Sequence, residues 1–262
     1  MMFDASFDLA EARILLSNDD GIAAPGLKAL EHAMRRVSRD VWVVAPELEQ
    51  SGAGHSLTLR RPLRIRRLGR SRRFAVDGTP TDSVLLAIRQ IMRDRPPSLL
   101  ISGINRGANL AEDLTYSGTV AAAMEGALLQ VPSIAVSLAV SNGATPLWDT
   151  AASLIAAIVE RLVTGPWPAN TLMNVNIPNI PVAQVTGIHA CAQGQRRMGD
   201  NLVEGTDPRG SRFYWIGPNR NEYAAQPGSD MAIVAAGGVS VTPVHLDLTH
   251  QAGLEALRSV FP

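Results

Sequence analysis

The sequence predicts an α/β protein with a doubly wound, mainly parallel sheet. Short apolar runs alternate with amphipathic segments of helical length along residues 13–180, and this alternation is typical of strand–helix–strand units. The first apolar run ends abruptly in Asp19, Asp20 and Gly21. Because ligands bind beyond the carboxyl ends of the strands in such sheets, this run also predicts where the functional site lies.

Each element has its own signal in the sequence. Residues 14–16 are wholly apolar and indicate a buried strand, and Pro25 suits the first position of the following helix. The predicted elements continue in order: a helix over 25–37, a strand over 40–45, an arginine-rich hairpin within 60–73, a helix over 81–92, a strand over 99–102, a small-residue helix after Ser117, a strand over 134–138, a helix over 150–163 and a strand over 172–177.

The composition changes beyond Pro178. Residues 185–243 are rich in Gly, Pro, Arg, Tyr and Trp, with strand-like pieces at 213–216 and 239–241, which predicts hairpins that project from the main domain. Residues 251–261 indicate a final helix. A projecting, partly apolar segment is typical of an oligomer contact. The sequence thus divides into an N-terminal extension over 1–12, a core over 13–180 and a C-terminal hairpin and helix extension over 181–262.

The composition describes an ordinary globular protein. The 262 residues are 46% hydrophobic and 18% charged with zero net charge, so nothing demands a membrane or a stable nucleic-acid complex. Cys191 is the only cysteine, which excludes an internal disulfide and predicts a reducing, cytoplasmic location. The first residues lack the basic and apolar parts of a signal peptide, and no run reaches the roughly 20 apolar residues of a membrane helix.

Eight arginines crowd between Arg60 and Arg73. Leu63 and Ile65 alternate with arginines there, as they would in a half-exposed strand. Two interpretations stay open: a solvated hairpin, or a guanidinium cluster that attracts phosphate-rich ligands through bidentate pairing.

Asp19 and Asp20 are the first candidate site. Neighbouring residues of a regular strand point to opposite faces, so the two carboxylates can share a ligand only if the backbone turns, which Gly21 permits. The alternative is that one aspartate caps the following helix while the other is solvated. Two adjacent acids preceded by Ser17 and Asn18 favour a cation site. Such hard oxygen ligands suit Mg²⁺ or Mn²⁺ rather than zinc.

Three further polar loops should surround the same strand ends. EQSGAGHS offers the Ser51 hydroxyl, and SGINRGAN offers the carboxamides of Asn105 and Asn109. YSGT precedes a helix, where free N–H groups favour an anion, although a plain Ser117 cap is the alternative. A cation beside an oxyanion site is the combination that phosphate-ester chemistry uses.

Together these motifs resemble the SurE (survival protein E) family of metal-dependent nucleotidases. The resemblance rests on SNDDG, QSGAGHSLT, GTPTDSV, SGINRGANL, YSGTVAAAMEG, DPRG and YWIGP, and covers nearly the whole chain after Arg13. Gln50 stands where the family often has a basic residue, and Ala108 where proline is common. Neither departure removes a ligand, and both bear on substrate preference.

The resemblance implies a Rossmann-like core and a 5′-nucleotidase, a phosphomonoesterase that hydrolyses nucleoside 5′- and 3′-monophosphates, with short polyphosphate as a further substrate in some members. It implies a homodimer or homotetramer with exchanged C-terminal segments. One divalent ion per subunit, Mg²⁺ or Mn²⁺, is then expected. The implied metal ligands are Asp19, Asp20, Ser51 and Asn105, and the implied phosphate-binding residues are Asn109, Ser117, Gly118 and Thr119.

The catalytic residues expected on this basis are Asp19, Asn109, Ser117 and Thr119. Asp19 would orient the attacking water, but attack by its own carboxylate, giving an aspartyl-phosphate, stays open. The five histidines fit the role of base poorly: His55, in the serine loop, is the nearest candidate, whereas His189, His245 and His250 are expected to serve structure.

Other classes of protein fit the sequence less well. It lacks G-x-G-x-x-G after the first strand, a P-loop and a G-x-S-x-G elbow. The two acids are also adjacent, whereas haloacid-dehalogenase-type phosphatases have them two apart. A nucleotide-binding sensor without turnover is the non-enzymatic alternative.

Overall fold

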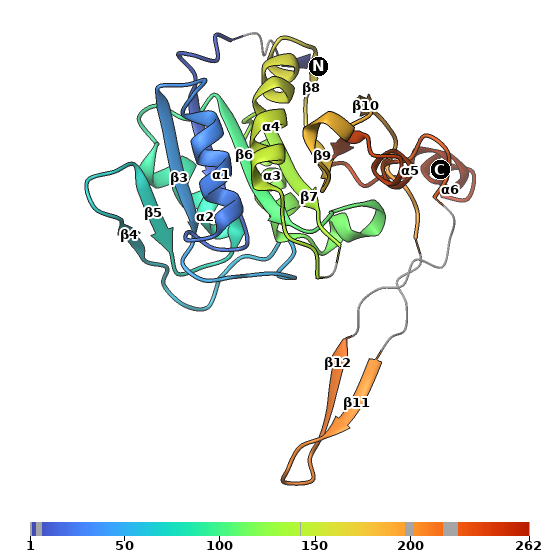
Figure 1. The fold of residues 1–262 in the computed structure, drawn as a ribbon. Coiled ribbons are helices and arrows are strands. Elements are labelled where there is room, and N and C mark those ends of the chain that lie inside the picture. Colours follow the sequence, from blue (N-terminus) through green and yellow to red (C-terminus); the bar gives the residue numbers. More distant parts are fainter. Residues whose placement is uncertain (1, 4–6, 142, 197–201, 217–224, 262) are drawn as a thin grey trace.

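The computed structural model describes residues 2–3, 7–141, 143–196, 202–216 and 225–261. Its centre is a nine-stranded sheet with helices on both faces (Figure 1). Six strands at the middle of the sheet run parallel. In spatial order they are β5 (Arg73–Val76), β3 (Asp40–Pro46), β2 (Arg13–Ser17), β6 (Leu99–Arg106), β7 (Ser133–Ala139) and β9 (Thr171–Pro178).

Numbered along the chain, these six strands lie in the order 3-2-1-4-5-6, which is that of a Rossmann fold. The order reverses between β2 and β6, and ligands of such folds bind in the crevice at this reversal. The predicted fold class is therefore confirmed, and the reversal lies beside Asp19 and Asp20, which follow β2.

Three strands extend the sheet beyond its parallel centre. β4 (Ile65–Arg67) pairs antiparallel with β5 and forms the predicted arginine-rich hairpin. On the other side β13 (Val239–His245) pairs antiparallel with β9, and β10 (Ile188–Ala190) pairs parallel with β13. The prediction that residues 239–241 project as a hairpin is wrong, because β9 offers them a free sheet edge and Val239 is fully buried there. The sheet therefore crosses the expected boundary at residue 180.

Two layers of helices cover the sheet. Helices α1 (Pro25–Met34) and α4 (Trp148–Val163) cover one face, and α2 (Pro80–Leu86) and α3 (Gly118–Leu128) cover the other. Ile14 and Leu16 face the first layer and Leu15 the second. Both faces of β2 are buried, which explains its unbroken apolar run.

Some elements differ from the prediction in length. The helix predicted over 81–92 is α2 followed by a π-helical turn over Ala87–Ile91, in which the Met92 N–H donates to the Ala87 carbonyl at 2.8 Å. Two short 3₁₀ segments cover Ala111–Thr115 and Val182–Gln184. In the N-terminal extension β1 (Met2–Phe3) pairs with β8 (Trp167–Pro168).

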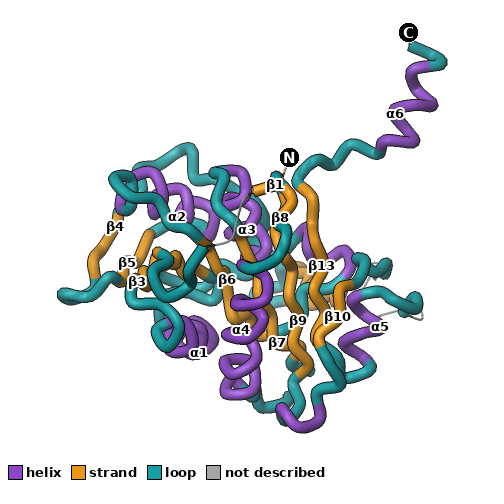
Figure 2. The backbone as a smooth tube through the Cα atoms, turned by 90° about the horizontal axis from the view of Figure 1, so that it is seen from above, coloured by secondary structure: helices purple, strands orange, loops and turns teal. Residues whose placement is uncertain are grey.

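The C-terminal part adds a hairpin and two helices. β11 (Leu202–Thr206) and β12 (Arg212–Ile216) pair with each other and stand apart from the main sheet (Figure 1). Helix α5 (Asp230–Ala235) packs on β13, whereas α6 (Gln251–Arg258) leads away from the body (Figure 2). Within the described ranges no helix has the length and apolar character needed to span a bilayer.

Candidate active site

The carboxylates of Asp19 and Asp20 line one cavity of about 820 Å³ at the reversal of strand order. The chain turns directly after them, because Gly21 has a φ of +93°, a conformation that favours glycine. The side-chain amide of Asn18 donates to the Gly21 carbonyl at 3.0 Å and holds this turn. The predicted bend is therefore present, and it brings both carboxylates to one side.

The loop that follows β3 is hydrogen-bonded to the backbone of Asp19. The Gln50 N–H donates to the Asp19 carbonyl at 2.8 Å. Both Glu49 and Ser51 line the cavity, and the Ser51 hydroxyl donates to Glu49 at 2.9 Å. The structure therefore brings Ser51 to the predicted site, with its hydroxyl proton on Glu49.

The end of β6 supplies the next wall. A Cβ at Gly103 would lie 2.3 Å from the Val136 carbonyl oxygen, so only glycine fits where the β6–β7 register shifts. Asn105 lines the cavity and donates its amide to the Gly107 carbonyl at 3.0 Å, and its Oδ1 has no hydrogen-bond partner within the described chain. The next backbone N–H, of Arg106, lies 3.4 Å from Asp20 Oδ2.

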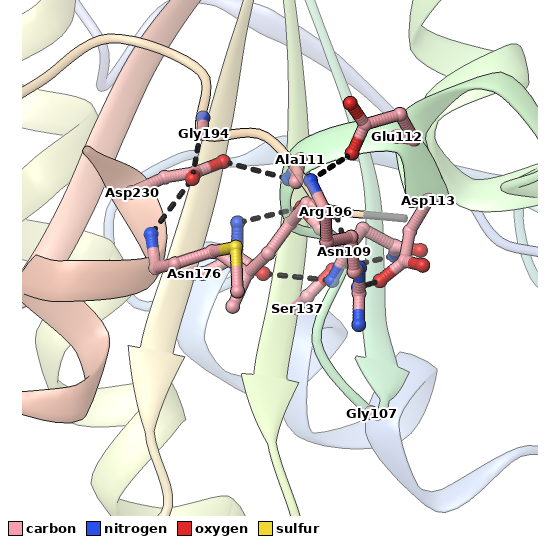
Figure 3. Close-up of polar contacts among 12 residues, drawn as sticks. Gly107, Asn109, Ala111, Glu112, Asp113, Ser137, Asn176, Gly194, Arg196 and Asp230 are labelled. Atoms are coloured by element: carbon pink, nitrogen blue, oxygen red, sulfur yellow. Dashed lines mark hydrogen bonds and ion pairs between the residues drawn. The ribbon is translucent and has the colours of Figure 1, made fainter. Parts of the chain in front are cut away.

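Asn109 belongs to residues 107–115, which we call the asparagine loop. It is buried and lines the cavity, and its amide donates to the Ser137 hydroxyl at 2.8 Å (Figure 3). Its backbone N–H donates to Asn176 at 2.8 Å, and its carbonyl accepts from Asn174 and Asn176 at 2.9 and 3.0 Å. Strands β7 and β9 thus fix both the side chain and the backbone of Asn109.

The start of α3 meets Asp19 closely. Ser117 lines the cavity and caps the helix, accepting from the Val120 N–H at 3.1 Å. A Cβ at Gly118 would lie only 2.7 Å from Asp19 Cβ, and the buried Thr119 donates its hydroxyl to Asp19. Of the four predicted phosphate-binding residues, Asn109 and Ser117 line the cavity. Gly118 and Thr119 instead contact the side chain of Asp19.

The two carboxyl groups have unusual electrostatics. Burial raises the pKa of Asp19 above its ordinary value, against the opposing hydrogen bond from Thr119. Burial, followed by the charge of Asp19, raises the pKa of Asp20 to about 6. No described lysine, arginine or histidine forms an ion pair with either carboxylate. Asp19 is buried and Asp20 is half-buried, and the charge of Arg106 opposes the rise in the pKa of Asp20 without cancelling it. A bound cation would stabilise two adjacent carboxylates in this setting.

This donor set fits a hard divalent cation. Among the described residues no three His, Cys, Asp or Glu side chains group as a metal site, so a cation here would depend on Asp19, Asp20 and neutral oxygens. Ser51 and Asn105 line the same cavity and carry such oxygens. Carboxylate, amide and hydroxyl oxygens without nitrogen or sulfur suit Mg²⁺ or Mn²⁺.

The histidines lie elsewhere. His55 Nε2 is 3.1 Å from Glu125 Oε2, and no histidine of the described chain lines the cavity. His250 caps α6 by accepting from the Gly253 N–H, and His245 accepts from the Asp247 N–H. The weak candidacy of His55 as a base therefore gains no support from its position.

The cavity also has walls to which the sequence analysis gave no role. They are formed by Arg106, Asp113, Tyr116, Pro146 and Trp148, besides Glu49 and residues 24–26 at the start of α1. The Trp148 ring approaches α1 so closely that a Cβ at Gly26 would lie 3.0 Å from its Cζ3. Trp148 begins a helix remote from the other motifs, so no local signal in the sequence marks it.

The arginine-rich segment is a hairpin whose charges are largely paired. Five of its eight arginines form ion pairs with carboxylates: Arg61 and Arg64 with Asp77, Arg66 with Glu47, Arg72 with Asp40 and Arg73 with Glu31. Arg67 lies over the Phe74 ring. These contacts favour the interpretation of this segment as a solvated hairpin.

Comparison with known proteins gives a consistent result. The family model described as "Survival protein SurE" matches residues 14–200. A protein of Paramagnetospirillum magneticum named 5′-nucleotidase SurE is 51% identical over 261 residues, all of both chains. Its namesake from Rhodospirillum rubrum is 49% identical over 99% of this chain and all of its own. The crystal structure of the SurE protein from Aquifex aeolicus, 40% identical, has a TM-score of 0.84 over 95% of this chain and all of its own.

Proposed function

The chain belongs to the survival protein SurE family, and from that premise we propose that it hydrolyses nucleoside 5′-monophosphates to nucleoside and phosphate, as a 5′-nucleotidase. The observation that carries the proposal is the cavity at the reversal of strand order. The buried Asp19, the half-buried Asp20, two carboxamides and the start of α3 meet there. Carboxylates and anion-binding groups that line one cavity suit a phosphate ester with a cation.

We propose that Asp19, Asp20, Asn105 and Ser51 hold one Mg²⁺ or Mn²⁺. When bound, this ion would polarise a phosphoryl oxygen and lower the pKa of a water molecule. The Ser51 hydroxyl can donate to Glu49 and still offer its lone pairs, and Asn105 has its Oδ1 free of other described partners. Thr119 and Gly118 support this set by holding Asp19 in place.

The phosphate would lie against Asn109 and Ser117. Ser117 accepts from the Val120 N–H, so its own hydroxyl proton is available to a phosphoryl oxygen. The N-terminal N–H groups of α3 and its dipole add to the attraction for an anion. Asn109 is held by four hydrogen bonds and is thus preorganised, which favours stabilisation of developing charge.

Asp19 is the residue that we assign to orienting the attacking water. Its Oδ1 accepts from the Thr119 hydroxyl, and the residue is buried and lines the cavity. A carboxylate fixed in this way can accept a proton from water but has little freedom to swing toward phosphorus. Rapid acid quench during turnover tests this, because an aspartyl-phosphate would be trapped as a phosphate adduct on the peptide that contains Asp19, whereas direct attack by water would leave that peptide unmodified.

The nucleoside would extend along Tyr116 and Trp148. Tyr116 is 55% exposed at the cavity rim, and Trp148 is half-buried in its wall. Aromatic faces of this kind accept any base by stacking, at about 1–3 kcal/mol per base. Activity on 3′-monophosphates and short polyphosphate, which the resemblance implies, would use the same cation and phosphate positions.

Phosphate release decides between the enzyme and a non-catalytic sensor. With Mn²⁺ present we expect turnover of adenosine 5′-monophosphate, and loss of it on chelation. Trp148→Ala should raise KM for this nucleotide about tenfold or more but change it little for ribose 5-phosphate, which lacks a base. Binding of the nucleotide without release of phosphate under several divalent metals would show a sensor instead.

A further inference from the structure

We propose that Arg196 and Asp230 are positioning residues of the nucleotidase reaction, which hold the asparagine loop in its working geometry without touching substrate. The inference rests on the proposed function. Both residues come from the C-terminal third of the chain, and the loop lies more than 80 positions earlier. In Figure 3 Asp230 and Arg196 lie close to Ala111, Glu112 and Asp113 of the loop.

Asp230 is fully buried and joins three backbone N–H groups. Its Oδ2 accepts from Ala111 at 3.0 Å, and its Oδ1 accepts from Gly194 at 2.8 Å and Met231 at 2.7 Å (Figure 3). Ala111 has a φ of +51°, which residues other than glycine rarely adopt. Such a conformation persists only where its surroundings hold it. The hydrogen bond from Ala111 to Asp230 stabilises this backbone conformation. Gln193 also stabilises it by donating its side-chain amide to the Ala111 carbonyl at 3.0 Å.

Arg196 fixes the next residues of the loop. Its backbone N–H donates to Glu112 Oε2 at 2.6 Å, and its guanidinium donates to the Leu110 carbonyl at 3.1 Å. The same guanidinium pairs with the Asp113 carboxylate, and both side chains are largely buried, at 12% and 21% exposure. One residue therefore contacts the loop at three positions.

The position of the asparagine loop determines where the cavity-lining residues Asp113 and Ser117 lie. Asp113 lines the cavity, and its backbone carbonyl accepts from the Tyr116 and Ser117 N–H groups, both at 3.0 Å. A shift of Asp113 would therefore move Ser117 and the start of α3. Within the same loop, Asn109 directly precedes Leu110 and Ala111, which Arg196 and Asp230 hold. Arg196 and Asp230 thus control the distance between the two residues that we assign to the phosphate.

Substitutions can separate positioning from folding. Arg196→Met keeps the length of the side chain and removes its charge. Asp230→Asn can keep an oxygen toward Gly194 and Met231 while it turns an amide toward the Ala111 N–H. We expect each to lower kcat for adenosine 5′-monophosphate on the order of 10²-fold, with KM changed less than about threefold. Arg196→Lys keeps the positive charge but lacks the planar guanidinium with its several N–H donors, so it should recover part of kcat.

Arg13 provides a matched control. It pairs with Asp40 at 2.7 Å with both side chains 16% exposed, and it also donates to the Arg95 carbonyl at 2.8 Å, at the far end of the sheet from the cavity. Arg13→Met should lower the melting temperature about as much as Arg196→Met and leave kcat of the folded enzyme unchanged.

The proposal is overturned if Arg196→Met and Asp230→Asn keep the wild-type kcat, or lose activity only in proportion to the folded fraction seen by circular dichroism. A loss of the same size in Arg13→Met would overturn it as well. Should Asp230→Asn not fold, the two Arg196 variants decide the question. A wild-type protein that releases no phosphate would instead contradict the proposed function.

Discussion

Asp20 carries the sharpest prediction among single residues. Asp20→Asn removes one ligand charge but keeps the shape of the side chain, so we expect phosphate release with Mn²⁺ to fall about 100-fold or more. The fold should survive, because the substitution also removes the repulsion between Asp19 and Asp20. Steady-state phosphate release measures the expected loss of turnover, and a melting curve recorded in chelator tests whether the fold survives. Near-normal turnover by the variant would show that the cation site lies elsewhere.

The pKa of Asp20 predicts a pH dependence. It is about 6 in the folded metal-free protein and 3.8 as the ordinary value, so between these pH values the folded state binds more protons than the unfolded state. The free energy of unfolding of the metal-free protein should therefore fall as pH rises from about 4 to 6. A divalent cation removes this penalty by stabilising the ionised carboxylates.

Melting curves test this directly. The rise in melting temperature produced by Mn²⁺ should be larger at pH 7.5 than at pH 5, where protons compete for Asp20. Asp20→Asn should show little rise at either pH. An equal rise at both pH values in the wild-type protein would argue against cation binding by these carboxylates.

Among the elements, the start of α3 combines structure and chemistry. Ser117→Ala should cost about 1 kcal/mol of stability, because the Val120 N–H loses its partner. It should also lower kcat on the order of 10²-fold if the hydroxyl donates to the phosphoryl group. Thr79 offers the comparison, since it caps α2 by accepting from the Asp82 N–H at 3.0 Å. Thr79→Ala should lower stability alone, and equal kinetics of the two variants would reduce Ser117 to a helix cap.

The arginine-rich hairpin leads to a different expectation. Arg60 and Arg70 are exposed and have no carboxylate partner in the described chain, whereas five of their neighbours do. With so much of its charge paired, the hairpin should steer anions weakly. We expect Arg60→Glu with Arg70→Glu to leave hydrolysis of nucleotide and of short polyphosphate within about twofold. A loss confined to polyphosphate that disappears at high salt would restore the steering interpretation.

The β11–β12 hairpin belongs to the scale of the whole molecule. Phe213, Tyr214, Trp215 and Ile216 are exposed on it by 41–87%, and Tyr223 lies outside the described residues. Aromatic residues left without a core are typical of interfaces. We propose that a second copy of the chain covers them, in a homodimer or homotetramer with exchanged C-terminal segments.

Light scattering after size exclusion tests this assembly at micromolar concentration. Trp215→Glu should shift the wild-type oligomer toward monomer, whereas Val182→Glu, which changes another exposed apolar residue, should not. Truncation after Pro178 is a poor test, because it would also remove β13 and β10 from the main sheet. A wild-type protein that is monomeric and fully active would refute the proposal.

The sequence by itself determined the local elements and the chemical character of the site. Apolar runs identify the buried strands, and the acids and carboxamides that follow β2 and β6 identify oxygen-rich loops. These signals are local, because side-chain period, proline, glycine and helix caps act within a few residues. The family resemblance extended them to a nucleotidase, which the comparisons confirm at the level of the family. The division at residue 180, the cytoplasmic location and the individual site roles stay predictions.

Only the tertiary structure decided what depends on the arrangement of distant segments. It moved residues 239–241 into the main sheet, because the edge of β9 was free to pair with them. It placed Trp148 in the cavity wall, turned Thr119 toward Asp19, and brought Arg196 and Asp230 to the asparagine loop. Contacts between residues 80 or more positions apart depend on strand order and helix packing, which no local pattern encodes. The pairing of charges in the arginine-rich hairpin is decided in the same way, since Glu31, Asp40 and Glu47 reach it from α1, β3 and the loop after β3.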